Sequence, residues 1–401
     1  MVYSALILSL VLIIFTLGKS PFFRVDRAGA SIIGATLTII TGVMTFDQAV
    51  KTVDYRTIIL LFSMMLISSY MNVIGLFDFL GYYAMDRLKT AKGLLGIVIG
   101  MTGLLSAFLI NDIVCLLFTP IVISLCRRAK LQPIPYLLAV ALSSNIGSAA
   151  TLIGNPQNIL IGSLSHLAFG WYMLLALPIS ILGLFLVYGV LAKVYAQELS
   201  QPLNLPEEQL RTKPIPRILL IKGIVILGAV VLGFSLGPEP ALVASLGAAV
   251  LLITRRLKPN KVYAGIDYNL LVIFIGLFVV VGGVEQSGLF TLLIGKIKMI
   301  NFQAFTVLTV VLSNIVSNVP AVMLLKFMIP AEHSSLWWAN MAIFSTLAGN
   351  LTITGSIANL IVVELAKKSG IKIGFGDYLR IGFPITIILV LIGMLYFEVL
   401  I

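Results

Sequence analysis

The chain has 401 residues, of which 59% are hydrophobic and only 11% are charged, and its formal net charge at pH 7 is +11. Soluble domains carry about 25% charged residues, so this composition excludes a soluble globular protein. The basic balance does not indicate a nucleic-acid partner, because cytoplasmic loops of membrane proteins carry an excess of Lys and Arg.

The charges lie in short islands between apolar stretches of about 17 to 20 residues, the length that crosses a bilayer as a helix. In the first half these stretches predict helices at 1–17, 28–44 and 55–73, and an amphipathic stretch follows to residue 92. The first helix lacks a basic start and a small-residue cleavage site. We therefore interpret it as a retained helix rather than a signal peptide.

Two apolar arms come next, at 93–110 and 113–125, and an Asn-Asp pair separates them. The second arm is too short to cross the membrane alone, so we expect the two arms to form a re-entrant hairpin. A helix at 134–165 follows, and a Gly- and Asn-rich stretch at 154–158 predicts that this helix is discontinuous. A long helix at 171–194 ends the first half.

The second half repeats this order of elements. It predicts helices at 218–236, 240–254 and 268–284, hairpin arms at 303–317 and 319–330, a discontinuous helix at 338–366 and a long helix at 380–400. Residues 53–77 align on 266–290 without a gap, and both segments begin with an Asp-Tyr pair and end in Gly-Leu-Phe. Such internal similarity indicates a duplication.

The sequence therefore predicts an all-α polytopic membrane protein made of two repeats, 1–196 and 218–401, joined by a polar cytoplasmic linker at 197–217. We expect about ten transmembrane crossings in total, together with two re-entrant hairpins and two discontinuous helices. Because each half then crosses an odd number of times, we expect the second repeat to be inverted relative to the first.

The basic residues agree with this topology. It places 22 of the 27 Lys and Arg residues on one side, which the positive-inside rule assigns to the cytoplasm. The other side receives Lys51, Arg56, Lys296, Lys298 and Lys326. We expect a multi-pass protein of the cell inner membrane.

Inverted repeats with broken helices are typical of secondary transporters, since half-helix ends present free N–H and C=O groups to a solute in mid-membrane. The polar side chains at the two hairpin tips and the two breaks are our candidates for binding a solute or ion. They are Asn111, Asp112, Asn145, Asn155, Asn158, Ser317, Asn318, Asn350, Thr354, Ser356 and Asn359. For the amides, the alternative is that they only cap helices or satisfy backbone groups at the breaks.

Asp112 is the only acidic residue that this topology places deep in the membrane. A carboxylate there is costly unless it is paired or protonated, so we interpret Asp112 as the proton-coupling residue. The alternative is a structural Asp that caps the second hairpin arm and stays ionised.

Motifs for other chemistry are absent from the sequence. It contains no P-loop, no GxSxG and no HExxH motif, so we expect neither ATP hydrolysis nor an enzyme. We interpret Cys115 and Cys126 as small apolar side chains that only fill space in the interior. No cluster of His, Cys, Asp and Glu residues suggests a metal site. We expect no cofactor.

Several stretches resemble the ion transporter superfamily, which includes arsenite permeases, NhaD-type sodium/proton antiporters and divalent-anion/sodium symporters. They are Phe-Leu-Ile-Asn-Asp at 108–112, Ser-Asn-Ile-Gly at 144–147, Gly-Asn-Pro-Gln-Asn at 154–158 and Ser-Asn-Ile-Val-Ser-Asn-Val-Pro at 313–320. The carboxylate symporters carry Ser-Asn-Thr at both tips, whereas here the tips read Ile-Asn-Asp and Ser-Asn-Val. The Asn-Asp tip is most similar to the arsenite permeases, as is Gly-Ser-x-Ala-x-Leu at 355–360.

This resemblance implies efflux of arsenite or antimonite by antiport with protons. Arsenite near neutral pH is mostly the uncharged trihydroxide, which suits a site without Lys or Arg. The alternative is a sodium-coupled carboxylate or sulfate symporter, or a sodium/proton antiporter, on the same scaffold; a channel or an intramembrane enzyme is a third class. The partners are then a small solute or ion and membrane lipid, with no nucleic acid, while a homodimer and a soluble ATPase partner stay open.

Overall fold

A computed structural model of the chain describes residues 1–86, 90–200, 217–290 and 300–400, and within this part the named elements are all helices, with an isolated bridge between Lys19 and Asp26. The first half contains α1 (Val2–Leu17), α2 (Arg27–Ile40), α3 (Phe46–Thr52), α4 (Tyr55–Val73), α5 (Leu76–Asp86), α6 (Ala91–Phe108), α7 (Asn111–Arg128), α8 (Ile134–Ser148), α9 (Pro156–Ser165) and α10 (Phe169–Val194). The expectation of an all-α polytopic membrane protein is confirmed.

The second half follows the same order of elements. After η1 (Glu198–Ser200) come α11 (Arg217–Ser235), α12 (Pro240–Leu252), α13 (Pro259–Tyr263), α14 (Tyr268–Gln286), α16 (Phe302–Val316), α17 (Asn318–Leu325), η3 (Lys326–Met328), α18 (Ser334–Ala348), η4 (Ile353–Gly355), α19 (Ile357–Lys368) and α20 (Phe375–Leu400). Most of the predicted linker, at 201–216, lies outside the described residues. The inversion of the second half stays a prediction.

Several details differ from the sequence-based expectation, among them the unpredicted short helix α13 and the start of α20 at Phe375 rather than at residue 380. The second hairpin arm α7 continues to Arg128 rather than ending near residue 125, so it is 18 residues long. The short helix α3 was not predicted, although Thr45 and Gln48 form the capping box that marks its start. At 1.5 Å per residue α7 is about 27 Å long, so chain length alone does not decide whether this arm crosses or returns.

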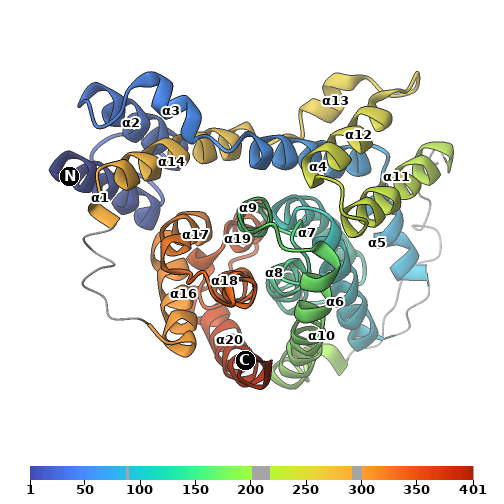
Figure 1. The fold of residues 1–401 in the computed structure, drawn as a ribbon. Helices are drawn as coiled ribbons and strands as arrows, with labels where there is room; N and C mark the ends of the chain where they lie inside the picture. The colour runs from blue at the N-terminus through green and yellow to red at the C-terminus, as the bar shows by residue number, and fades with distance from the viewer. Residues whose placement is uncertain (87–89, 201–216, 291–299, 401) are drawn as a thin grey trace.

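The helices form two sets, which Figure 1 shows along the top and in the lower part of the view. The upper set, which we call the frame, consists of α1–α4 and α11–α14, and the lower set, the central bundle, consists of α6–α10 and α16–α20. In the frame the halves exchange a helix, since α14 packs against α1, α2 and α3 whereas α4 packs against α11, α12 and α13. In the central bundle α7 packs against α19 and α17 against α9, so the halves also meet there.

Small residues allow the closest helix contacts. A Cβ atom added to Gly147 of α8 would overlap the backbone of Gly103 in α6, and one added to Gly276 of α14 would overlap Ser31 of α2. Helices in lipid gain little from hydrophobic attraction to each other, so close packing at such small residues is a main source of their association.

Six described helices are long and apolar enough to cross a membrane, namely α4, α6, α10, α11, α14 and α20. The 26 residues of α10 and of α20 give each a length of about 39 Å, more than the bilayer core of about 30 Å. Only 22% of the apolar window of α11 is buried within the protein. Its exposed Leu and Ile side chains fit a surface solvated by lipid.

Candidate functional site

Both predicted discontinuous helices are broken where expected. In the first half α8 ends at Ser148 and α9 begins at Pro156, and in the second half α18 ends at Ala348 and α19 begins at Ile357. Asn155 caps α9 by accepting a hydrogen bond from the backbone N–H of Asn158 at 2.8 Å. Ser356 caps α19 by accepting one from the N–H of Ala358 at 3.2 Å. The polar residues of the breaks are thus buried where two half-helices meet.

Asn145, on the last turns of α8, joins the two halves. Its Oδ1 accepts hydrogen bonds from Asn111 Nδ2 at 3.1 Å and from Ser356 Oγ at 3.0 Å. Its Nδ2 donates to the Oδ1 atoms of Asn350 at 2.8 Å and Asn359 at 3.1 Å. The side chain is only 1% exposed, and all its donors and lone pairs are used. Asn145 therefore fixes the first hairpin tip and the second break relative to each other.

Thr346 of α18 has the corresponding position on the other side of the site. Its Oγ1 accepts from Asn155 Nδ2 at 3.2 Å and from Gln157 Nε2 at 3.1 Å, and it lies 3.2 Å from Asn158 Oδ1, to which it can donate. Asn145 and Thr346 are 201 positions apart, as are Asn155 and Ser356, and Asn158 and Asn359. Each half therefore reaches into the break of the other half through equivalent positions.

Asn158 and Asn359 also satisfy the backbone at the breaks. Asn158 Nδ2 donates to the carbonyl oxygen of Thr151 at 3.0 Å, and Asn359 Nδ2 donates to those of Gly349 at 2.7 Å and Thr352 at 3.2 Å. A carbonyl left unsatisfied in hydrocarbon costs several kcal/mol. These amides therefore both support the breaks and join the networks between the halves, which combines the two roles considered for them.

The first hairpin tip is docked on the first break. The backbone N–H of Asn111 donates to the carbonyl of Gly154 at 2.9 Å. A Cβ atom on Gly154 would overlap the carbonyl oxygens of Ser106 and Ser148, so only glycine permits this approach. Asn111 is not the cap of α7, because the capping position is Ile110. Its side chain binds Asn145 instead, while its Oδ1 is buried without a donor.

Asp112 does not cap α7 either, since no side chain caps this helix. The structure therefore does not show the capping bond that the structural alternative for Asp112 requires. Among the described residues no donor forms a hydrogen bond with its half-buried carboxyl group.

The second hairpin tip differs from the first. Ser317 has the left-handed φ of 76°, which is costly for a residue with a side chain. Asn318, the first residue of α17, is 9% exposed and its Oδ1 has no donor. Within the described part of the chain, no backbone bond joins Asn318 to Gly355, the counterpart of the bond between Asn111 and Gly154. The first tip is therefore bonded to its break through the backbone, and the second tip lacks the equivalent bond.

The structure brings seven of the sequence-based candidates into the buried networks, namely Asn111, Asn145, Asn155, Asn158, Asn350, Ser356 and Asn359. Asp112 and Ser317 are half-buried, Asn318 has no described hydrogen bond to the networks, and Thr354 lies outside them. That side chain is exposed, and its one described contact is with Thr352 Oγ1 at 3.3 Å. Thr346 and Gln157 were missed. Thr346 could have been found by adding the repeat spacing of the breaks to Asn145, whereas nothing in the sequence singles out Gln157. Among the described residues no three His, Cys, Asp or Glu side chains form a group that could hold a metal ion.

None of the side chains in the Asn145 and Thr346 networks is charged. The networks consist of carboxamides and hydroxyls that bind each other, and two of their neighbours, Asn111 and Asn318, keep buried acceptor atoms free. Free acceptors in a buried site favour a partner that brings donors or positive charge. Close to them, Cys115 Sγ lies 3.0 Å from Ser144 Oγ, so that thiol already has a partner.

Comparisons with known proteins find a matching family and several similar transporters. A family model described as citrate transporter matches residues 10–343. The putative transporter arsB of Dictyostelium discoideum is 28% identical, with 92% of this chain and 87% of the relative covered. The silicon efflux transporter LSI3 of Oryza sativa subsp. japonica is also 28% identical, with 93% and 94% covered. The solved YdaH transporter of Alcanivorax borkumensis has a similar fold, with a TM-score of 0.60 at 14% identity over 98% of this chain and 96% of that one.

Proposed function

The chain belongs to the citrate transporter family and is a multi-pass secondary transporter rather than an enzyme, and from this premise we propose that it exports arsenite or antimonite in exchange for protons. The observation that carries the proposal is the pair of free acceptors, Asn111 Oδ1 and Asn318 Oδ1, beside uncharged hydrogen-bonded networks. A neutral trihydroxide offers three O–H donors. Such a solute can donate to an acceptor like Asn111 Oδ1 or Asn318 Oδ1 without bringing a charge that the site has no side chain to balance.

Asp112 supplies the coupling in this proposal. A carboxylate at membrane depth is costly, and protonation removes that cost. Since Asp112 is next to Asn111 in the chain, its protonation state can bias whether the tip stays docked on the first break. Protons carried inward would then be exchanged for solute carried outward.

Two relatives support this choice of cargo. One carries the name arsB and the other is named as a silicon efflux transporter. Silicon in neutral water is the uncharged tetrahydroxide, so its chemistry as a cargo is close to that of arsenite. A small neutral hydroxide is therefore the substrate class that best fits both the relatives and the free acceptors.

The second candidate is a sodium-coupled carboxylate symporter, which the description of the family model favours. The free acceptors would suit a cation, and the N-termini of α9 and α19 at the two breaks would offer N–H groups to a carboxylate. Against it, a citrate trianion would find no Lys or Arg in the Asn145 and Thr346 networks.

The inverted arrangement of the repeats is part of the proposal. The order of elements is the same in both halves, and Asn145 and Thr346 contact the break of the opposite half from equivalent positions. Inverted repeats would let the same site open to one side and then to the other. A homodimer and a soluble ATPase partner stay predictions.

Flux measurements with the purified protein in liposomes test the cargo. We expect arsenite flux that follows an imposed pH gradient and does not depend on sodium. Uptake of citrate that requires sodium, with no arsenite flux, would refute the proposal.

The variant Asp112→Asn tests the coupling. It keeps the shape and loses the titration, so the pH gradient should no longer drive arsenite flux. Asp26→Asn is the matched control, because an Asn can keep the cap on Gly29 N–H at the start of α2 and coupling should persist. Coupled flux with an unchanged pH dependence in Asp112→Asn would show that Asp112 is not the carrier.

A further inference from the structure

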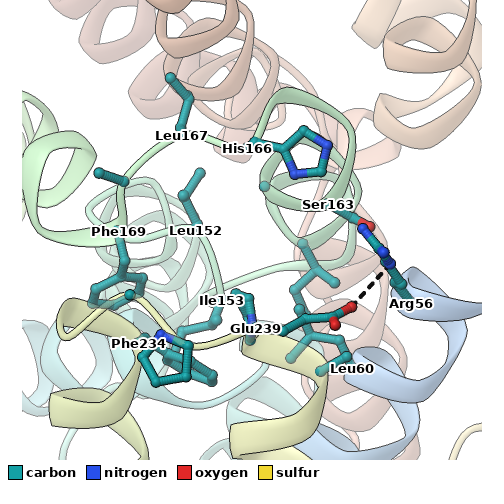
Figure 2. A pocket seen from close by; sticks show the side chains of 17 residues that line it. Arg56, Leu60, Leu152, Ile153, Ser163, His166, Leu167, Phe169, Phe234 and Glu239 are labelled. Carbon is teal, nitrogen blue, oxygen red and sulfur yellow. Dashed lines mark ion pairs between the residues drawn. The ribbon is translucent and has the colours of Figure 1, made fainter.

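A pocket of about 450 Å³ lies between the frame and the central bundle, and none of the side chains in the Asn145 and Thr346 networks lines it. The frame contributes the start of α4 and the connection from α11 to α12. The central bundle contributes the first break, α9 and the start of α10. Figure 2 shows side chains from both sets facing one cavity. This volume is large enough for several waters, so a small hydrated solute fits.

The rim of the pocket is polar. Arg56 Nε forms an ion pair with Glu239 Oε1 at 2.9 Å, and Ser163 and His166 lie on the same side of the cavity. The side chains of Arg56 and Glu239 are 62% and 38% exposed, and an ion pair this exposed contributes little to stability. The positive-inside rule assigns this rim to the outer side, because Arg56 is one of the few basic residues there.

The floor of the pocket is apolar. Leu60, Leu152, Ile153 and Ile159 line it and are all buried. On one flank the ring of Phe169 from α10 contacts the ring of Phe234 from α11, with centroids 5.5 Å apart. In this conformation the central bundle and the frame therefore contact each other through apolar side chains below the polar rim.

The floor is directly connected to the polar site. Leu152 and Ile153 belong to the first break, and two residues after Ile153 comes Asn155, whose Nδ2 binds Thr346. These apolar residues line the pocket and lie within three residues of the buried network along the chain. A thin apolar layer of this kind stops a polar solute when it is closed and lets it pass once it becomes wet.

We propose that this pocket is the outer vestibule of the transport path, and that Leu152 and Ile153 are its closed outer gate. A neutral hydroxylated solute leaves the buried site past these two side chains and enters a rim whose one positive and one negative charge balance each other. The inference rests on the proposed function for the identity of that solute. The location of the path rests only on the pocket and its lining.

Thiol labelling of whole cells tests this assignment. The natural Cys115 and Cys126 are both 0% exposed, so the unaltered chain gives a low background. In single variants Leu167→Cys marks the rim and Ile153→Cys marks the gate. Leu160→Cys is the matched control, because Leu160 is equally apolar and buried on α9 but does not line the pocket. A membrane-impermeant maleimide is added from outside.

We expect Leu167→Cys to react at all times, Ile153→Cys to react slowly, and Leu160→Cys not to react. Under a gradient that drives transport, labelling of Ile153→Cys should become about tenfold faster, the change that a shift of 1.4 kcal/mol between closed and open populations produces. Leu152→Cys serves as a second gate variant should Ile153→Cys fail to fold.

Labelling of Ile153→Cys that is no faster than that of Leu160→Cys during transport would overturn the vestibule, as would reaction of Ile153→Cys only from the cytoplasmic side. The driving cargo is whichever one the flux assay identifies, arsenite with a pH gradient or citrate with sodium. Sodium-driven citrate flux with outward labelling of Ile153→Cys would therefore refute the arsenite proposal and still support the vestibule.

Discussion

Replacement of Asn145 by Ala is the most direct test of how the two halves are held together. The change removes four hydrogen bonds, to Asn111, Ser356, Asn350 and Asn359, from a fully buried position. Side-chain hydrogen bonds in membrane proteins average about 0.6 kcal/mol, and buried bonds in general contribute up to about 1.5 kcal/mol. The expected loss in the free energy of unfolding is therefore about 2 to 6 kcal/mol.

Asn340→Ala is the matched control. Asn340 is equally buried in α18 but makes a single described side-chain bond, from its Nδ2 to Thr306 Oγ1 at 2.7 Å. Its loss should cost about 1 kcal/mol. Unfolding by denaturant in detergent micelles measures both variants, and flux in liposomes shows whether the remaining fold still transports.

The variant Asn145→Asp sharpens this test. It keeps the two acceptor bonds but turns both donor bonds into contacts between oxygens. Asn350 and Asn359 cannot turn their amides to compensate, because their Nδ2 atoms already donate to the carbonyls of Leu142 and Gly349. We expect this variant to be less stable than the natural chain at neutral pH and to recover partly as the pH falls, since a protonated Asp regains one donor.

The reasoning would be refuted if Asn145→Ala and Asn340→Ala lost the same stability, or if Asn145→Ala transported like the natural chain. Either result would mean that the Asn145 network does not hold the first hairpin tip against the second break.

Two further changes test the packing, again by unfolding in detergent. Gly147→Ala should lower the free energy of unfolding by several kcal/mol, because the added Cβ atom overlaps the backbone of Gly103, and backbone is costly to displace. Gly100→Ala is the control: its Cβ atom meets nothing within 4 Å, so this variant should be neutral or slightly stabilising. Lys222→Met should cost about 1 to 3 kcal/mol without changing the dependence of flux on solute concentration, because Lys222 Nζ donates to the carbonyls of Val250 and Ile253 at 2.6 and 2.8 Å, at the end of α12. A stable Gly147→Ala, or a Lys222→Met that alters only flux, would contradict these contacts.

The sequence by itself determined the class of protein and the positions of the irregular backbone. Apolar stretches of membrane length predicted the helices, and the Gly- and Asn-rich segments at 154–158 and 354–359 predicted both breaks. The physical reason is that hydrocarbon enforces local backbone hydrogen bonding, so any interruption needs residues that can satisfy the freed groups. Asn158 and Asn359, which bind carbonyls at the two breaks, were found in this way.

Only the tertiary structure decided which of these residues meet. Thr346 escaped notice because a single Thr in an apolar helix has no local signal, and its importance comes from Asn155 and Gln157 of the other half. Thr354 looked equivalent to its neighbours but faces outward. The exchange of α4 and α14 between the halves was also invisible in the sequence, since contacts between segments about 200 residues apart depend on packing, and hydrophobic patterns specify burial without specifying a partner.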